Sequence, residues 1–345
     1  MSASEIKPRV RRDRKVSGSI TLADVAKIAG VAISTASRAL NEPNLVSREA
    51  LQAVKDAVAR TGYVPNALAG GLASHRSRLV ATIVPTFSGP VFSGYIDSIV
   101  ETLAEAGYQV MLGQSGYAHS REDDLLAAII GRRPDGIILT GIVHSPAGRR
   151  RLAAAGIPVV ETWDLTPTPI DMLVGFSHEQ IGAAVADFFH ARGGRRPGII
   201  SADDSRAALR NKGFSERAAK FGIKDVPVAL SPAPAKLGAG RSGLADLLHR
   251  APDLDAVMCS SDFLALGVNM EAQARGIKIP ERLAVMGFGD LNFAEYVLPA
   301  LTTVRVDGDN IGRQAARFIL DKLGGKPITD RVVDVGFSIV SRTSG

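Results

Sequence analysis

Only one of the 345 residues is a cysteine, Cys259, and a single thiol excludes an intramolecular disulfide framework. No stretch approaches the roughly 20 consecutive apolar residues that a membrane-spanning helix needs. The N-terminal segment is charged through Lys15 and has no apolar region of the kind that a secretory signal carries. We therefore expect a reduced protein of the cytoplasm, without a membrane partner.

Patterns that would place an enzyme or a metal site are also missing. The six histidines have no metal-ligand spacing, and no Gly-x-Ser-x-Gly segment is present to hold the nucleophile of acyl transfer. Residues 238–243 match the glycine pattern of dinucleotide-binding loops, but a proline-containing loop over 231–237 precedes them instead of a strand. We expect no catalytic residue, no metal and no cofactor.

Positive charge is concentrated in the first fifth of the chain. Residues 1–76 contain twelve Lys and Arg against six Asp and Glu, which leaves 29 basic and 29 acidic residues in the remainder. A basic head on a neutral body favours binding to a polyanion. Residues 1–19 are expected to form a disordered basic arm, which either adds nonspecific attraction to DNA or is only a solvated tail.

Residues 20–66 predict a three-helix DNA-binding domain. Apolar residues recur at helical spacing and break at Gly30, the pattern of a helix-turn-helix, although an ordinary helical hairpin shows the same spacing. Ser47 is a natural N-cap for a third helix over 48–60, and Thr61-Gly62 end it. Ile33, three short polar residues and one arginine face outward on the second helix. The polar ones suit phosphates and a guanine edge: Ser34, Thr35, Ser37 and Arg38.

Residues 67–77 predict a hinge segment. It is weakly helical because Gly70 and Gly71 each cost about 1 kcal/mol relative to alanine in a helix. An isolated helix this short is marginal, so we expect it to be helical only when something holds it.

From Leu79 on, short apolar runs alternate with amphipathic helices, which predicts parallel sheets covered on both faces. Ligands of such folds bind beyond the carboxyl ends of the strands. The expected helices include 95–106, 178–192, 210–221, 241–250 and 263–275. Ten strands are expected, which suits two sheets better than one: 79–85, 108–112, 136–140, 158–161, 173–176, 198–201, 227–230, 256–259, 283–287 and 303–306.

Several segments carry a family resemblance in their order and spacing: TLADVAKIAGV, STASRALN, VSREALQAV, GYVPNALA, RNKGF, SSDFLALGV, MGFGD and LTTVRVD. From about Ile20 to its end the chain resembles the LacI/GalR family of bacterial transcription regulators. Within that family, GYQVMLGQSGY, PDGIILTG and GIPVVETWDL are most similar to gluconate-utilisation and ketogluconate-responsive repressors.

The resemblance implies a homodimer of helix-turn-helix heads and hinge helices on a pseudo-palindromic operator. It also implies a periplasmic-binding-protein-like core over 78–345, made of two doubly wound parallel-sheet subdomains that enclose a small effector. The amino subdomain is expected over about 78–175 and 308–331, and the carboxy subdomain over about 176–307 and 332–345.

The same resemblance assigns residues of the head and hinge. Base contacts fall on Ile33, Ser34 and Arg38, and backbone contacts on Thr21, Thr35, Ser37 and Asn41. In the hinge, Leu72 takes the place of a leucine that wedges into the minor groove, with Ala69 and Ala73 beside it. Ala32 stands where the family usually has a capping serine, and Ala67 and Gly70 replace larger polar hinge residues.

Effector contacts are implied for Asp164, Phe176, Arg206, Arg210, Ser261 and Gly289, with Ser88, Pro90 and Phe92 in a loop over 88–92 that closes the opposite side. The planar fork of Arg210 can hold a carboxylate in two parallel bonds. Glycine at 289, where many sugar-binding relatives carry an acid, removes a charge that would repel an anion.

We therefore expect a repressor that gluconate or a ketogluconate releases from its operator. Alternatives are a neutral-sugar-responsive regulator of this family, a solute-binding protein and a sugar-acid enzyme. Arg210 in a salt bridge at a helix start and Phe176 in the core are the plainer interpretations of those two residues.

Overall fold

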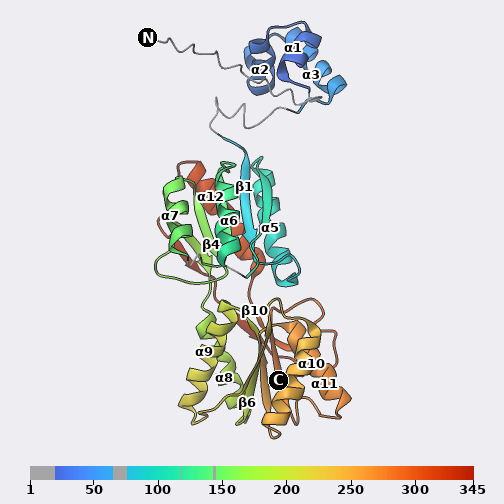
Figure 1. Cartoon of the computed structure of the whole chain (residues 1–345), viewed down its shortest axis with the longest axis vertical. Coiled ribbons are helices and arrows are strands. Elements are labelled where there is room, and N and C mark those ends of the chain that lie inside the picture. Colours follow the sequence, from blue (N-terminus) through green and yellow to red (C-terminus); the bar gives the residue numbers. More distant parts are fainter. Residues whose placement is uncertain (1–19, 65–75, 118, 143–144) are drawn as a thin grey trace, which may run out of the picture. The chain divides into compact units, whose positions relative to one another are not determined.

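A computed structural model describes residues 20–64, 76–117, 119–142 and 145–345. The chain divides into two compact units, residues 1–75 and 76–345, and each is described by itself (Figure 1). The basic arm expected over 1–19 lies outside the described residues, as do residues 67–75 of the hinge with Ala69, Leu72 and Ala73.

Within residues 20–64, the part of the first unit that the structure describes, there are three helices, α1 (Leu22–Ala29), α2 (Ile33–Asn41) and α3 (Arg48–Thr61), with a 3-10 turn at Pro43–Leu45. Gly30 ends α1 at a φ of 68°, Ser47 accepts a hydrogen bond from the Ala50 N–H, and Gly62 ends α3. The predicted three-helix unit and its caps are confirmed. Small apolar side chains form its core: Val25, Ala26, Ala36, Ala39, Val54 and Ala57.

The second unit contains two six-stranded sheets. The amino sheet runs in the order β11-β5-β4-β3-β1-β2 and is parallel throughout. Its strands are β1 (Leu79–Val84), β2 (Gln109–Gln114), β3 (Gly136–Thr140), β4 (Val159–Thr162), β5 (Met172–Gly175) and β11 (Val332–Asp334).

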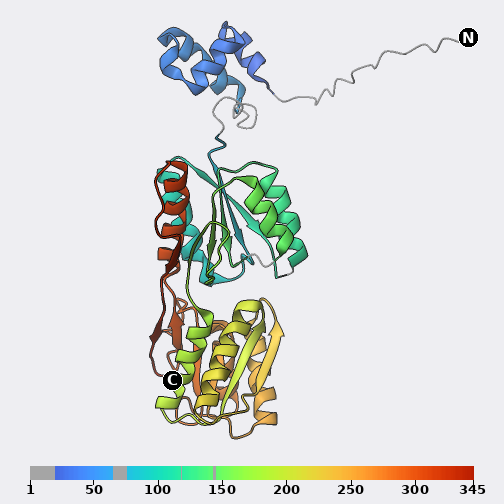
Figure 2. The same cartoon turned by 90° about the vertical axis from the view of Figure 1, so that its left-hand side faces the viewer.

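Helices cover both faces of the amino sheet because successive strand residues point to opposite sides. Val80 and Ile138 pack toward α5 (Ser93–Glu105) and α12 (Gly308–Leu323) on one face. Ala81 and Ile137 pack toward α6 (His119–Ile130) and α7 (Pro146–Ala155) on the other. The two helical layers are seen edge-on in Figure 2, with α12 in red and α6 and α7 in green.

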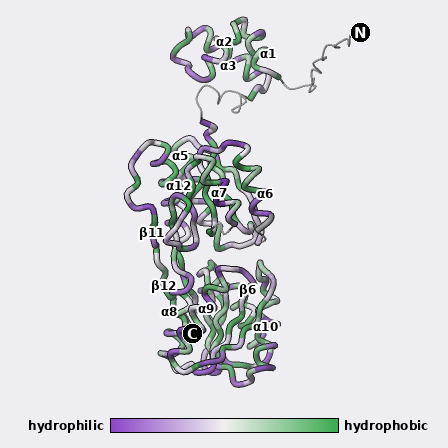
Figure 3. The backbone as a smooth tube through the Cα atoms, turned by 60° about the vertical axis from the view of Figure 1, so that its left-hand side comes forward, coloured by the Kyte–Doolittle hydropathy of each residue, from purple (hydrophilic) through white to green (hydrophobic). Residues whose placement is uncertain are grey.

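The carboxy sheet runs in the order β12-β10-β9-β8-β6-β7, and only β12 is antiparallel to its neighbour. The strands are β6 (Pro197–Asp203), β7 (Val228–Pro232), β8 (Ala256–Cys259), β9 (Ala284–Phe288), β10 (Thr302–Arg305) and β12 (Ser338–Val340). One face carries α8 (His178–Ala191) and α9 (Ser205–Lys220), and the other carries α10 (Leu237–Arg250) and α11 (Asp262–Ala274) (Figure 1). Hydrophobic residues gather along the strands of both sheets (Figure 3).

Three expectations about the second unit need correction. Twelve strands are described rather than ten, because the expected set omits β11 and β12. Each is three residues long, and both lie in the segment VVDVGFSIV, where Asp334, Gly336 and Ser338 interrupt the apolar residues. Since β11 pairs with β5, Val332–Asp334 belongs to the amino sheet, and the last crossover lies after residue 334 rather than at 331/332. Helix α9 begins at Ser205 and α10 at Leu237, each earlier than expected.

The glycine pattern at 238–243 lies inside α10. A Cβ on Gly240 would collide with the main chain of α11 at Leu264, so this glycine permits close packing of two helices. None of the described helices is long and apolar enough to cross a bilayer.

Candidate functional site

The first candidate surface is the outer face of α2. Its inner face packs through Ala36 and Ala39, which leaves Ile33, Ser34 and Arg38 exposed. Ile33 is 55% exposed, so its apolar side chain is open to contact with a partner. These three predicted base-contacting residues therefore share one accessible helix face.

The residues predicted to contact the DNA backbone lie around that face. Thr35 and Ser37 are half-buried, and the Asn41 side-chain amide donates to the Ser37 carbonyl at 3.0 Å. The Thr21 hydroxyl donates to Asp24 at 2.7 Å in the cap of α1. Helix α2 begins at Ala32 without a side-chain cap, as the sequence predicts.

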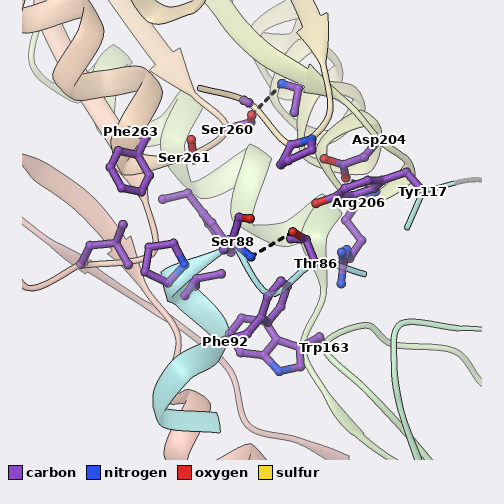
Figure 4. A pocket seen from close by; sticks show the side chains of 18 of the residues that line it. Thr86, Ser88, Phe92, Tyr117, Trp163, Asp204, Arg206, Ser260, Ser261 and Phe263 are labelled. Carbon is purple, nitrogen blue, oxygen red and sulfur yellow. Dashed lines mark hydrogen bonds between the residues drawn. The ribbon is translucent and has the colours of Figure 1, made fainter. Parts of the chain in front are cut away.

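The second candidate site is a cavity where carboxyl ends of strands of the two sheets meet (Figure 4). The amino side supplies the segment after β1 and the residue after β4, including Thr86, Ser88, Pro90, Phe92 and Trp163. The carboxy side supplies α9 and the segments after β6, β8 and β9, including Asp204, Arg206, Arg210, Ser260, Ser261 and Leu291. Of the predicted effector residues, Ser88, Pro90, Phe92, Arg206, Arg210 and Ser261 line this cavity.

The wall from the amino subdomain is largely apolar. A 3-10 turn at Pro90–Phe92 turns Phe92 onto Trp163, edge to face with ring centroids 5.0 Å apart. The Thr86 hydroxyl fixes the start of this loop by accepting the Ser88 N–H at 3.1 Å (Figure 4). This wall can cover the carbon skeleton of a small ligand.

The opposite wall is cationic, and Arg210 is its most buried charge, with 6% of its surface exposed. Its Nη1 lies 2.9 Å from His178 Nδ1, its Nη2 donates to the Ser260 carbonyl at 3.2 Å, and its guanidinium lies 4.1 Å above the Phe288 ring. Burial lowers the pKa of Arg210 to about 10, so it remains charged at neutral pH. The alternative of a salt bridge at a helix start is wrong, because Arg210 lies within α9 and pairs with no described carboxylate.

Arg206 lies one turn before Arg210 on α9, with its guanidinium 5.6 Å from the Phe92 ring centroid. Its buried Nη1 has no hydrogen-bond partner among the described residues, and neither has Arg210 Nε. Asp204 is the one carboxylate in the described lining, and its Oδ1 already accepts the N–H groups of Arg206 and Ala207. Two guanidinium groups thus face one carboxylate, which makes the cavity attractive to an anion.

A second cavity adjoins the first and shares Tyr117, Asp204 and Arg206 with it. Asp164, predicted to touch the effector, lines this second cavity instead of the first. Its hydroxyl-rich and acidic lining, which also includes Glu122 and Asp203, suits hydroxyl groups of a ligand rather than a second anion.

Two predicted effector residues do not line either cavity. Phe176 is fully buried and packs against Trp163 and His178, with centroids 5.9 and 4.8 Å away, so it lies in the core beneath the site. Gly289 has a φ of 128°, and a Cβ there would lie 3.5 Å from Val91 and 3.6 Å from Leu291, both lining residues. A side chain at 289 would therefore reach the rim of the cavity.

The cavity has further lining residues that were not predicted from the sequence: His178, Tyr117, Asp204, Ser260 and Phe288. A signal for His178 exists in hindsight: it follows Ser177, the N-cap of α8, directly after a strand that ends at the cleft edge of the sheet. No group of three or more His, Cys, Asp or Glu within the described part of the chain could hold a metal.

Comparison with known proteins decides the family. The model for "Bacterial regulatory proteins, lacI family" matches residues 21–66, and that for "Periplasmic binding protein-like domain" matches residues 186–345. The HTH-type transcriptional regulator GntR of Pseudomonas aeruginosa is 37% identical over 335 residues, which cover 96% of this chain and 98% of the relative. The chain belongs to the LacI family.

Other comparisons agree with this assignment. The Escherichia coli K12 regulator GntR is 29% identical over 319 residues, 92% of this chain and 96% of the relative. The solved structure of a LacI family regulator from Silicibacter pomeroyi is 33% identical with a TM-score of 0.89, and the match covers 94% of this chain and 99% of that one. The lac repressor dimer bound to operator, at 21% identity, 95% and 99% coverage and a TM-score of 0.80, shows the same fold.

This LacI-family protein is therefore a DNA-binding transcriptional regulator and not an enzyme. The lac repressor structure with the same fold is that of a dimer bound to operator and to the anti-inducer ONPF.

Proposed function

We propose that this regulator acts in the cytoplasm as a homodimeric repressor and that a carboxylated sugar, gluconate or a ketogluconate, releases it from a pseudo-palindromic operator. The observation that carries the proposal is Arg210, a buried cation at the cavity wall that pairs with no described carboxylate. A buried charge is costly unless a partner of opposite sign compensates it. A ligand carboxylate would supply that partner to Arg210 and to the unpaired Nη1 of Arg206.

A neutral sugar is the competing ligand. It would satisfy hydroxyl-binding groups such as Ser88 and Ser261 and leave Asp204 as the one carboxylate of the described lining for two guanidinium groups. Polyol hydroxyls fit the adjoining cavity with Asp164 equally well in either case. The charge of the ligand is thus the property that Arg210 discriminates.

Calorimetry on the whole protein, comparing gluconate and 2-ketogluconate with glucose, tests the proposal. Arg210→Gln should weaken gluconate binding roughly 30- to 1,000-fold, because losing one partner of a desolvated charge pair costs about 2–4 kcal/mol. Arg210→Lys, which keeps the charge without the fork, should weaken it about tenfold. Arg217→Gln is the matched control, since Arg217 lies on the same helix but pairs with Asp187 at 2.6 Å on the surface.

Tighter binding of glucose than of gluconate would overturn the proposal, as would an Arg210→Gln variant that binds gluconate like the parent. The direction of the response is read from an operator gel shift, in which gluconate should lower the fraction of bound DNA.

The homodimer is proposed to use the segment between β9 and β10. Tyr296 and Leu298 are 78% and 91% exposed there, and together they offer apolar surface that a second copy of the chain would cover. Leu298→Glu should shift the protein toward monomer in analytical ultracentrifugation. Leu230→Glu is the control, because Leu230 is also exposed but lies on β7, at the other edge of the carboxy sheet from β12. A dimer that survives in Leu298→Glu rejects this surface.

A further inference from the structure

His178, the first residue of α8, connects the two walls of the cavity. Its Nδ1 lies 2.9 Å from Nη1 of Arg210 in the carboxy subdomain, and its Nε2 lies 3.0 Å from the carbonyl oxygen of Trp163 in the amino subdomain. A guanidinium group can only donate, so Nδ1 accepts and the ring proton is on Nε2, which donates to Trp163. One imidazole in one tautomer therefore bridges the two subdomains.

The surroundings of the His178 ring hold Nδ1 toward Arg210 and Nε2 toward the Trp163 carbonyl. It is 3% exposed and packs edge to face on Phe176 at 4.8 Å. Burial, together with the nearby cations Arg210 and Arg206, holds the pKa of His178 well below its ordinary value, so the ring is neutral at physiological pH.

Trp163 is the unusual partner in this chain of contacts. Its φ of 62° lies in the left-handed region, which is unfavourable for a residue other than glycine and persists only where the surroundings hold it. The His178 N–H on its carbonyl is one such constraint, and the Trp163 N–H donates to Val174 at 3.3 Å.

The Trp163 ring also contacts the cavity loop and two of the segments that join the subdomains. It packs on Phe92 of the cavity loop at 5.0 Å and on Phe176, the residue with which the chain leaves the amino sheet, at 5.9 Å. A Cβ on Gly308, at the start of α12 where the chain returns to the amino subdomain, would lie 3.2 Å from the ring. A displacement of Trp163 would therefore disturb the cavity loop and the two crossovers at Phe176 and Gly308 at the same time.

We propose that His178 is the positioning residue that transmits effector binding at Arg210 to the Trp163 main chain, and through it to the relative position of the two subdomains. This inference rests on the proposed function. A carboxylate drawn to the Arg210 fork competes with His178 Nδ1 for the same donors. Because the imidazole is rigid, a shift at Nδ1 also shifts the donor at Nε2 that holds the Trp163 carbonyl.

The quantity to measure is the coupling factor, the ratio of operator affinities without gluconate and at the plateau of a gluconate titration. It should be about 5- to 150-fold in the parent protein, the usual range for coupled sites. In His178→Phe, which keeps a ring but neither hydrogen bond, it should fall below about threefold even at the plateau. The carboxamide of His178→Gln offers one acceptor and one donor, as the imidazole does. The logarithm of its coupling factor should therefore be at least half of the parent value.

His190→Phe is the matched control. His190 lies on the same helix, and its Nδ1 is also 3.3 Å from an arginine, Arg195, but it stacks on Phe221 at 3.8 Å and lines neither cavity. The coupling factor of His190→Phe should equal that of the parent protein. The parent protein alone gives a second measurement: gluconate should change the hydrogen exchange of the amides at residues 163–165.

A parental coupling factor in His178→Phe overturns the inference, and so does a factor in His178→Gln no larger than in His178→Phe. If His178→Phe does not fold, unaltered exchange at residues 163–165 in the gluconate-bound parent overturns it. Absence of gluconate binding to the parent is a different result: it removes the proposed function, and this inference with it.

Discussion

The recognition residues of the head and those of the cleft differ in how much of the fold depends on them. On α2, Ile33 is 55% exposed and Ser34 and Arg38 lie on the same open face. In the cleft, Arg210 is 6% exposed and is held by His178, Ser260 and Phe288. A change on α2 should therefore alter DNA binding alone, whereas a change behind the cleft should alter both ligand binding and stability.

The largest expected effect lies behind the cleft, where α8 and α9 touch. A Cβ on Gly182 of α8 would collide with the main-chain carbonyl of Arg210, and backbone atoms cannot move aside as a side chain can. Gly182→Ala should lower the free energy of unfolding of the core by about 3 kcal/mol or more and separate His178 from Arg210. Urea denaturation measures the first effect and gluconate calorimetry the second.

Gly238→Ala is the control for this prediction. Gly238 lies in α10, and no atom lies within 4 Å of the position that a Cβ would take there, so alanine should stabilise the core by about 0.5–1 kcal/mol. Equal behaviour of the two variants would show that α8 and α9 can separate without cost.

The head could be predicted from the sequence because its information is local. Helical spacing, the break at Gly30 and the cap at Ser47 are readable within a few residues, and each is confirmed. The longer strands could be predicted for the same reason, from their apolar runs. Strand β11 could not, because Val332–Asp334 becomes a strand only through pairing with β5.

The cleft could be predicted only in part. The resemblance brought Arg210 forward, but the contacts that hold it join residues far apart in the chain: His178 is 32 positions away and Ser260 is 50. Phe176 shows the converse error, since a large aromatic residue near a predicted site is as readily core as lining. Spacing along the chain carries no information about such contacts.

The second prediction concerns the head. Arg38→Ala should weaken operator binding by about 1–3 kcal/mol, or roughly 5- to 150-fold, because an arginine that reads a base edge contributes that much discrimination. Because Arg38 is exposed, the melting temperature and the gluconate affinity should not change. Fluorescence anisotropy with labelled operator at fixed salt measures the change. Arg60→Ala, another exposed arginine at the end of α3, should have a smaller effect.

A third prediction separates the two regions by pH. The folded pKa of His178 lies well below 6.5, so below pH 6.5 the unfolded chain binds a proton that the folded core does not. The free energy of unfolding of the core is then complete above pH 6.5 and falls as the pH drops toward the folded pKa, by up to about 1.4 kcal/mol per pH unit. Residues 20–64 contain no histidine, so the head should not share this dependence.

Urea denaturation at pH 7.5, 6.5 and 5.5 measures this pH dependence. The quantity to compare is the difference in the free energy of unfolding between the parent and His178→Gln. Burial raises the pKa of Asp262 to about 6, which favours the folded state below pH 3.8 and ceases to do so as the pH rises through 6. Because both proteins contain Asp262, its contribution cancels in the difference. Parallel pH profiles for the two proteins would mean that His178 is protonated as easily in the folded core as in the unfolded chain.

The smallest expected effect is a gain in the head alone. Helix α2 begins at Ala32, which offers no side-chain acceptor to the first free N–H groups. Ala32→Ser should supply one and stabilise α2 by about 1 kcal/mol, seen as roughly fivefold slower hydrogen exchange of its amides in the whole protein. Ala59→Ser, on the exposed side of α3, adds the same hydroxyl inside a helix and should give no gain. Because α2 shares no residue with the cleft, Ala32→Ser should bind gluconate with the same affinity as the parent protein. A changed gluconate affinity would mean that the head and the core are coupled even without DNA.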